Sequence, residues 1–324
     1  MFTTIRLNKV QTRVITLGNP LNCSSEVIVV ITGGPGIPEF YIEFAEQLHR
    51  TTQKPVCIIG HAGHDVFENQ NENNNLKNTW SLYNSDGQIE HKLDLINNYI
   101  DKRAKLHLIG HSIGAWLLME LLHKNDYLQK RILSVNLLFP TLQKFASTKN
   151  GKLVNNFVRY LQRLIFLILF IIQVFPTIRI VAVKLYLYLN SLPSYYEKRV
   201  MMYLNSAVQE KSMLLAFECM ERIQELNISA IKKVQHMANV LYSTDDRWVP
   251  MHHIHDLQKF TPQIALHQVN VEHAFVLKSS VYVAKIVGDL ILKQSYSLSH
   301  KYPGLINQNV SFYSYETNYI KDRK

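Results

Sequence analysis

The sequence predicts an α/β fold, in which helices flank a mostly parallel sheet, and three observations lead to this prediction. Four short apolar runs alternate with stretches of helical periodicity, at residues 27–31, 55–60, 106–109 and 133–139. The first run is β-branched throughout, as expected of a strand buried on both faces of a sheet. Regular alternation of this kind is typical of parallel strands joined by right-handed crossovers. The 324 residues suffice for a single domain with an insertion.

The remaining elements follow from the same patterns. Helices are predicted at residues 39–48, 89–99 and 115–122, and an Asn-rich polar stretch predicts a loop at 68–78. The alternation stops near residue 144 and resumes with two further strands, at 239–242 and 264–269. We therefore expect residues 145–235 to form a helical cap or lid inserted into the sheet domain. Residues 293–324 are polar and Tyr-rich, which predicts a poorly ordered tail.

The turn after the predicted strand at 106–109 carries the first candidate for chemistry. The chain there reads Gly110-His111-Ser112-Ile113-Gly114 and continues into a run of good helix formers. Strand, G-x-S-x-G and helix in this order indicate a nucleophile elbow, in which the flanking glycines leave room for a tight turn. Such a turn exposes the serine hydroxyl in front of a helix N-terminus. Ser112 is therefore the candidate nucleophile, and the architecture predicted is the α/β-hydrolase fold.

A serine hydroxyl needs a base, and the base needs an orienting carboxylate, in the chain order Ser, acid, His. Asp245 and Asp246 follow the strand at 239–242, and Asp246 fits the acid position better because it is the second residue past the small-residue turn. His273 follows the last strand, which is the topological place for the base. Three other histidines crowd a helix start, where surface positions or a fortuitous metal site explain them equally well: His252, His253 and His255.

The oxyanion of the reaction needs two backbone N–H donors. Ile113, the residue after the nucleophile, supplies the first candidate. Gly34 supplies the second, because the turn Gly33-Gly34-Pro35-Gly36 directly follows the first predicted strand. Serine chemistry of this kind requires no metal ion and no organic cofactor, so none is predicted.

Taken together, these residues resemble the lipid droplet-associated hydrolase family of the α/β-hydrolase superfamily, from about residue 27 to residue 292. The most specific shared segments are His61-Ala62-Gly63-His64 and Gly87-Gln88-Ile89-Glu90-His91-Lys92. The resemblance implies a Ser112, Asp246 and His273 triad in a serine lipid hydrolase of weak activity. It also implies residence on lipid droplets and on the cytosolic face of the endoplasmic reticulum membrane. The chain departs from the family's Pro-Gly-Asn-Pro-Gly at the oxyanion loop, although backbone donors survive that change.

Within the predicted cap, residues 160–190 are strongly apolar. Nine consecutive apolar residues occupy 164–172, and a second apolar stretch at 180–189 follows Pro176. Neither stretch approaches the ~20 residues that cross a bilayer, but two arms meeting at a proline can enter one leaflet and return. Residues 141–196 contain no acidic residue and seven basic ones: Lys144, Lys149, Lys152, Arg159, Arg163, Arg179 and Lys184. This pattern favours an element held at a lipid surface, and the alternative is a lid whose apolar faces pack on the core.

The overall charge and the cysteines restrict the partners. The formal net charge of +10 favours an anionic surface such as phospholipid headgroups, whereas no motif supports nucleic acid. Three widely spaced cysteines favour a reducing compartment, and the N-terminus lacks the pattern of a secretory signal. The expected function is hydrolysis of lipid esters, with a sterol ester, an acylglycerol or a small soluble ester as the open alternatives for the substrate. A largely non-catalytic protein that organises or tethers droplets is the alternative, and a proline-specific peptidase has only the GGPG turn in its favour.

Overall fold

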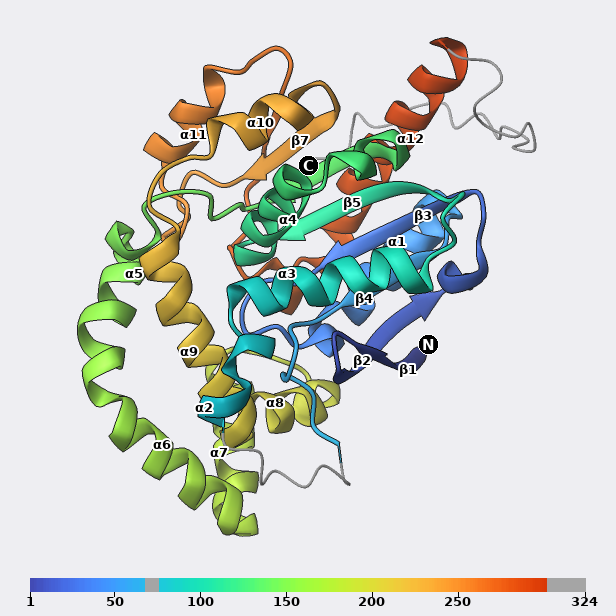
Figure 1. Cartoon of the computed structure of the whole chain (residues 1–324). Helices are drawn as coiled ribbons and strands as arrows, with labels where there is room; N and C mark the ends of the chain where they lie inside the picture. Colours follow the sequence, from blue (N-terminus) through green and yellow to red (C-terminus); the bar gives the residue numbers. More distant parts are fainter. Residues whose placement is uncertain (68–75, 302–324) are drawn as a thin grey trace, which may run out of the picture.

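A single eight-stranded sheet forms the centre of the protein in a computed structural model that describes residues 1–67 and 76–301 (Figure 1). The strand order is β1-β2-β4-β3-β5-β6-β7-β8, and every neighbouring pair from β4 to β8 is parallel. The strands are β1 Phe2–Leu7, β2 Val10–Leu17, β3 Glu26–Ile31, β4 Val56–Ile59, β5 Lys105–His111, β6 Ile132–Leu138, β7 Ala238–Tyr242 and β8 Ala265–Gln268. All six predicted strands are present, and the predicted fold is confirmed.

The antiparallel hairpin of β1 and β2 is an addition to the predicted strands. Leu7 pairs with Val10, so only Asn8 and Lys9 form the turn, and both have positive φ, at 43° and 68°. This is the backbone of the tight hairpin turns that Asn-Gly pairs usually mark. Lysine in place of glycine removes that signal, which explains why the sequence pattern did not predict the hairpin.

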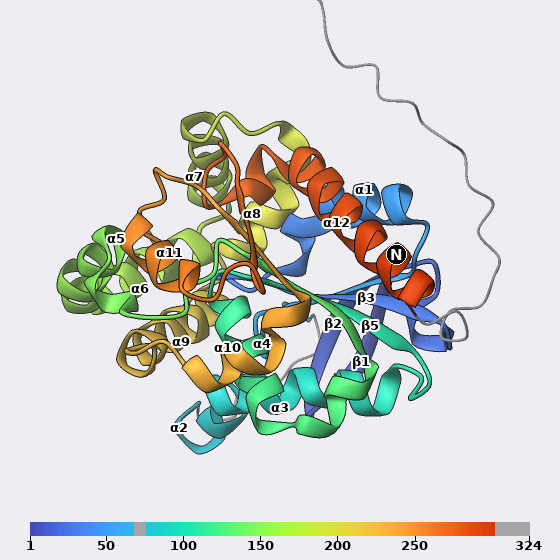
Figure 2. The ribbon, with the colours of Figure 1, turned by 90° about the horizontal axis from the view of Figure 1, so that it is seen from above.

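Helices cover both faces of the sheet (Figure 2). One face is covered by α1 (Ile42–Thr52) and α12 (Ser280–Lys301), and the opposite face by α3 (Ser85–Asp94), α4 (Ile113–Lys124) and α10 (Ile228–Val234). Alternate residues of β3 enter the two cores, since side chains along a strand point to opposite faces. The β-branched run at 27–31 is therefore explained by burial on both sides.

Helix α12 corrects the predicted tail. The helix continues to Lys301, so residues 293–301 are not the poorly ordered segment that the polar composition suggested. Its apolar residues Val283, Val287 and Ile291 are buried against the sheet, and Ser295 Oγ reaches Glu26 Oε2 at 3.2 Å. The rest of the predicted tail, 302–324, and residues 68–75 of the predicted loop lie outside the described residues.

The insertion between β6 and β7 is helical and extends to one side of the sheet (Figure 1). Its helices are α5 (Lys149–Leu153), α6 (Arg159–Val174), α7 (Pro176–Leu189), α8 (Glu197–Tyr203), α9 (Ser206–Arg222) and α10, with a π-helical turn at Val154–Val158. From Lys149 to Val174 they form one helix of 26 residues that contains an 18-residue window of mean hydropathy 1.8, and by length and composition alone this helix could cross a membrane. The expectation that each arm is too short to do so is therefore wrong for the first arm, because polar residues before 164 extend it.

The apolar side chains of α6 and α7 lie mostly on the outside. Only Leu169 in α6 and Val183 and Leu187 in α7 are buried. The exposed apolar side chains of the two helices are Tyr160, Leu161, Leu164, Leu167, Ile168, Phe170, Ile171, Val174, Ile178, Ile180, Val181, Leu185, Tyr188 and Leu189. The alternative of a lid with its apolar faces packed on the core does not describe this arrangement.

The contact between α4 and β3 leads to a first prediction, concerning Gly114→Ala. A Cβ at this position would lie 2.3 Å from the carbonyl oxygen of Thr32 and 2.7 Å from that of Ile31. Both contacts are with backbone, so we expect the free energy of unfolding to fall by about 3 kcal/mol or more. Urea denaturation measures this change. Gly34→Ala is the control, because its Cβ would meet only Ile113 Cδ1, at 3.8 Å, and an unfolding free energy equal in the two variants would contradict the prediction.

Candidate active site

Ser112 occupies the turn between β5 and α4. Its backbone has φ 54° and ψ −123°, a conformation that L-residues rarely adopt. A Cβ on Gly110 would lie 2.6 Å from the Cα of Ala115, so this turn requires glycine there. The Ser112 N–H donates to the carbonyl oxygen of Leu138 at 2.9 Å, which fixes the turn to the end of β6. Ser112 therefore lies in a sharp turn between strand and helix with a strained backbone.

The structure brings Ser112, His273 and Asp246 together. Ser112 Oγ lies 2.9 Å from His273 Nε2, and His273 Nδ1 lies 2.7 Å from Asp246 Oδ2. The three side chains come from the loops that follow β5, β8 and β7, three strands of the parallel sheet whose carboxyl ends share one edge. Asp245, the other candidate acid, is exposed. Chemically, this arrangement can act as a nucleophile, a base and an orienting carboxylate.

The carboxylate of Asp246 is fully enclosed, with none of its side chain exposed. Its Oδ1 accepts hydrogen bonds from the N–H groups of Trp248 at 2.7 Å and Val249 at 3.0 Å, and its Oδ2 faces His273. Three donors compensate the buried charge. A carboxylate can only accept, so His273 Nδ1 carries a hydrogen and Nε2 is left to accept from Ser112.

The competing histidines lie elsewhere, on α11 (Met251–Gln258). His253 is buried, and burial lowers its pKa to about 4. His252 and His255 are exposed. Within residues 1–67 and 76–301, no group of three or more His, Cys, Asp and Glu side chains is arranged to hold a metal ion.

The loop after β3 lies directly against Ser112. A Cβ on Gly33 would be 2.9 Å from the Cβ of Ser112. The Gly33 N–H donates to Tyr41 Oη at 2.8 Å, the Gly36 N–H donates to the Gly33 carbonyl oxygen at 2.8 Å, and proline has no N–H. This leaves Gly34 as the one residue of the turn whose N–H has no partner in the described part of the chain.

Ile113, the other predicted donor, is the first residue of α4. The N–H groups of a helix's first turn have no acceptor within the helix, so that of Ile113 is available. Gly34 lies beside it, since a Cβ on Gly34 would be 3.8 Å from Ile113 Cδ1. The two N–H groups that the sequence singled out therefore belong to neighbouring residues next to Ser112.

The two most specific sequence segments support this loop from behind. His64 Nδ1 donates to the carbonyl oxygen of Pro35, and the His61 N–H donates to that of Gly36 at 2.9 Å. Gln88 in turn holds Ala62 through both amide atoms, at 2.7 and 3.2 Å. The His-Ala-Gly-His and Gly-Gln-Ile-Glu-His-Lys segments thus pair with each other and hold the turn that contains Gly34.

The second of these segments also buries Lys92, whose Nζ donates to Gln88 Oε1 at 2.5 Å. Desolvation lowers the pKa of this amine well below its usual range. Burial likewise lowers the pKa of His64, to about 3. His64 is therefore neutral at pH 7 and supports the loop through its hydrogen bond to Pro35.

Sequence reasoning missed three side chains that touch the site or its loops. Thr141 Oγ1 lies 3.4 Å from Ser112 Oγ, and Tyr41 and His111 are hydrogen-bonded to each other at 2.6 Å. His111 stands inside the G-x-S-x-G pattern, but at a position that the pattern leaves free. Only the tertiary contacts reveal what these residues do.

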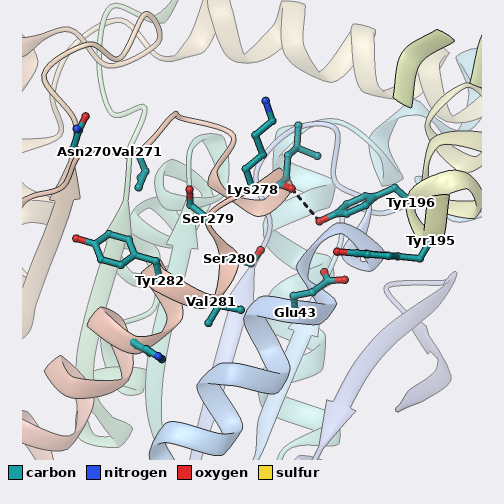
Figure 3. Close-up of a pocket in the computed structure, with 12 residues that line it drawn as sticks. Glu43, Tyr195, Tyr196, Asn270, Val271, Lys278, Ser279, Ser280, Val281 and Tyr282 are labelled. Atoms are coloured by element: carbon teal, nitrogen blue, oxygen red, sulfur yellow. Dashed lines mark hydrogen bonds between the residues drawn. The ribbon is translucent and has the colours of Figure 1, made fainter. Parts of the chain in front are cut away.

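A cavity elsewhere in the structure does not include Ser112 in its lining (Figure 3). It measures about 620 Å³ and is lined by Glu43 of α1, Tyr195, Tyr196 and the first turns of α12 with the segment before it. Tyr196 donates to the carbonyl oxygen of Leu277 at 3.3 Å, along the dashed line in Figure 3. Thr141, Tyr41 and His111, the three side chains described above, do not line this cavity. The cavity and the candidate active site are therefore separate.

Comparison with known proteins identifies the family. The model of the lipid-droplet associated hydrolase family matches residues 24–276. The lipid droplet-associated hydrolase of Drosophila melanogaster is 33% identical over 297 residues, covering 89% of this chain and 96% of that protein. The human lipid droplet-associated hydrolase is 26% identical over 275 residues, covering 81% of this chain and 83% of that protein.

Solved structures share the fold at low sequence identity. A bacterial membrane phospholipase A superimposes with a TM-score of 0.63 at 13% identity, covering 91% of this chain and 86% of the other. A putative lipase from Acinetobacter baumannii superimposes with a TM-score of 0.62 at 14% identity, covering 92% of both chains. The chain has the α/β-hydrolase fold and belongs to the lipid droplet-associated hydrolase family.

Proposed function

We propose that this protein is a serine hydrolase that cleaves carboxylic esters of lipids at the surface of lipid droplets. The observation that carries the proposal is the hydrogen-bonded series from Ser112 Oγ through His273 to Asp246, at 2.9 and 2.7 Å. The names of the relatives, lipid droplet-associated hydrolases, support both the reaction class and the location. Sterol esters and acylglycerols are the substrates proposed, with a low turnover.

The geometry of the site supports the following proposed reaction. Ser112 Oγ attacks the ester carbonyl carbon while His273 Nε2 takes the hydroxyl proton, and Asp246 stabilises the imidazolium that results. The N–H groups of Gly34 and Ile113 stabilise the oxyanion. The tetrahedral species collapses to an acyl-enzyme as His273 returns its proton to the departing alcohol oxygen. Water, deprotonated by His273, then attacks the acyl carbon, and the acid leaves as Ser112 regains its proton.

The location is proposed from helices α6 and α7. Their outward apolar side chains would be buried by the acyl chains of a phospholipid monolayer. Lys152, Arg159, Arg163, Arg179 and Lys184 in the same segment would lie near the headgroups, where each contributes up to ~1 kcal/mol at an anionic surface. A helix hairpin of this kind suits a droplet, which has no aqueous far side. The cytosolic face of the endoplasmic reticulum membrane is the second site proposed, because that leaflet also offers acyl chains and phospholipid headgroups.

A fluorophosphonate probe tests the proposal, because it modifies only serines activated by a neighbouring base. We expect covalent labelling of the wild-type protein at Ser112, located by peptide mass spectrometry, and no labelling of Ser112→Ala. Ser147→Ala, which changes an exposed serine of the insertion, is the control and should label at the wild-type rate. A folded wild-type protein that remains unlabelled contradicts the proposed function.

A second candidate function, organising or tethering droplets without catalysis, is favoured by the same exposed apolar helices. It predicts that Ser112→Ala leaves droplet size and clustering in cells as they are with the wild-type protein. An effect on droplets that disappears with Ser112→Ala supports the enzyme instead.

A further inference from the structure

A series of three hydrogen bonds connects the oxyanion loop to the loop that carries His273. The Gly33 N–H lies 2.8 Å from Tyr41 Oη, which lies 2.6 Å from His111 Nδ1. On the other side of the same ring, His111 Nε2 lies 3.0 Å from the backbone carbonyl oxygen of His273. Two loops that are far apart in the sequence therefore meet at one imidazole.

The chemistry of the groups assigns a direction to every bond in the series. The Gly33 N–H can only donate, so Tyr41 Oη accepts from it and gives its own hydrogen to His111 Nδ1. A neutral imidazole that accepts at Nδ1 carries its hydrogen on Nε2, and this hydrogen meets the carbonyl oxygen of His273. One protonation pattern gives every N–H and O–H group of the series an acceptor.

The surroundings of His111 keep it neutral. Its side chain is almost fully buried and packs edge-on against Phe275, with ring centroids 4.9 Å apart. Desolvation lowers the pKa of His111 well below its usual range, and a positive charge on His273, whose ring centroid is 5.3 Å away, lowers it further. The ring of His111 therefore stays uncharged when His273 takes a proton, and the three hydrogen bonds persist.

The backbone of His111 belongs to the rigid centre of the sheet. It is the last residue of β5 and pairs with Leu138 of β6. Its ring thus provides a fixed reference point for two connecting loops, one next to Gly34 and the other next to the base.

We propose that His111 and Tyr41 are positioning residues that set the oxyanion loop and the His273 loop at their working distance from Ser112. This inference rests on the proposed function, because it concerns the same Ser112 site. Neither residue touches the ester. Loss of the connection would let both loops shift, and a displacement of about 1 Å at reacting atoms can cost about 100-fold in rate.

Two substitutions at position 111 each keep one of the ring's two hydrogen bonds and remove the other. In His111→Asn the amide can occupy the place of Nδ1 and keep Tyr41, but it is too short to reach the His273 carbonyl oxygen. In His111→Gln the amide can reach that carbonyl oxygen but leaves Tyr41 without its acceptor. His111→Leu removes both contacts, and Tyr41→Phe removes a single oxygen atom.

The measurements are the fluorophosphonate labelling rate and kcat and KM for a soluble short-chain ester. We expect kcat and the labelling rate to fall about 100-fold in His111→Leu and about 10-fold in Tyr41→Phe, with KM within twofold of wild type. Asn and Gln at position 111 should each restore part of the loss. Because both residues act through one connection, Tyr41→Phe added to His111→Leu should cost little more than His111→Leu alone.

The results that overturn this inference differ from the result that overturns the proposed function. Labelling of Tyr41→Phe and of the Asn and Gln variants within twofold of wild type overturns the inference, even if His111→Leu fails to fold. A rate that falls only in proportion to the folded fraction, measured by circular dichroism, also overturns it, because the residues then support folding alone. If wild-type protein is not labelled at all, the proposed function itself fails, which is a different result.

Discussion

Replacement of Asp246 by asparagine is expected to lower kcat about 10⁴-fold while the protein remains folded. The amide oxygen of asparagine can take the place of Oδ1 and accept from the Trp248 and Val249 N–H groups, as the carboxylate does. Its NH₂ group then faces His273 Nδ1, where the wild-type Oδ2 accepts at 2.7 Å. A donor there forces the hydrogen of the imidazole onto Nε2, and the ring can no longer take the proton of Ser112.

The neighbouring Asp245 provides a matched control for this experiment. It is exposed, so Asp245→Asn makes the same chemical change one residue earlier and should leave kcat within twofold. Ester hydrolysis and circular dichroism are measured on both variants. A kcat for Asp246→Asn within tenfold of wild type would show that this carboxylate does not orient the base.

Aspartate at three outward positions of α6 is expected to release the protein from lipid droplets. Leu164, Leu167 and Phe170 are 51%, 55% and 59% exposed, so their replacement costs the folded protein little. Full burial of such a side chain in acyl chains stabilises binding by ~1.5–3 kcal/mol. An aspartate loses this stabilisation and is also repelled by anionic headgroups. The bound fraction should therefore fall by a factor of more than 100. Leu169 is left unchanged because it is only 7% exposed and packs on the protein.

Flotation of droplets from cells that express fluorescent fusions measures the bound fraction. The control variant adds the same three negative charges at exposed polar positions outside the insertion: Gln11, Gln53 and Gln258. It should stay on droplets, as should Ser112→Ala. A folded α6 variant that floats with droplets as completely as the control would mean that another surface makes the contact.

Much of the fold could be predicted from the sequence because its signals are local. A parallel strand buried on both faces needs an apolar run such as residues 27–31, and a turn as tight as that at Ser112 needs Gly110 and Gly114. The hairpin of β1 and β2 carried no such signal, since Lys9 stands at a positive φ where glycine is usual. The end of α12 at Lys301 also escaped prediction, because residues 293–301 are mostly polar in composition.

The candidate site was likewise predictable from the sequence only in part. The sequence by itself determined which residue types stand at the ends of β5, β7 and β8, so Ser112, Asp246 and His273 could be named in advance. Only the tertiary structure decided which way α6 turns its apolar side chains and what the ring of His111 contacts. Tyr41 and His111 are 70 residues apart, and His111 and His273 are 162 apart. Hydrogen bonds over such separations leave no periodicity in the chain, because they depend on where packing of the whole sheet places each side chain.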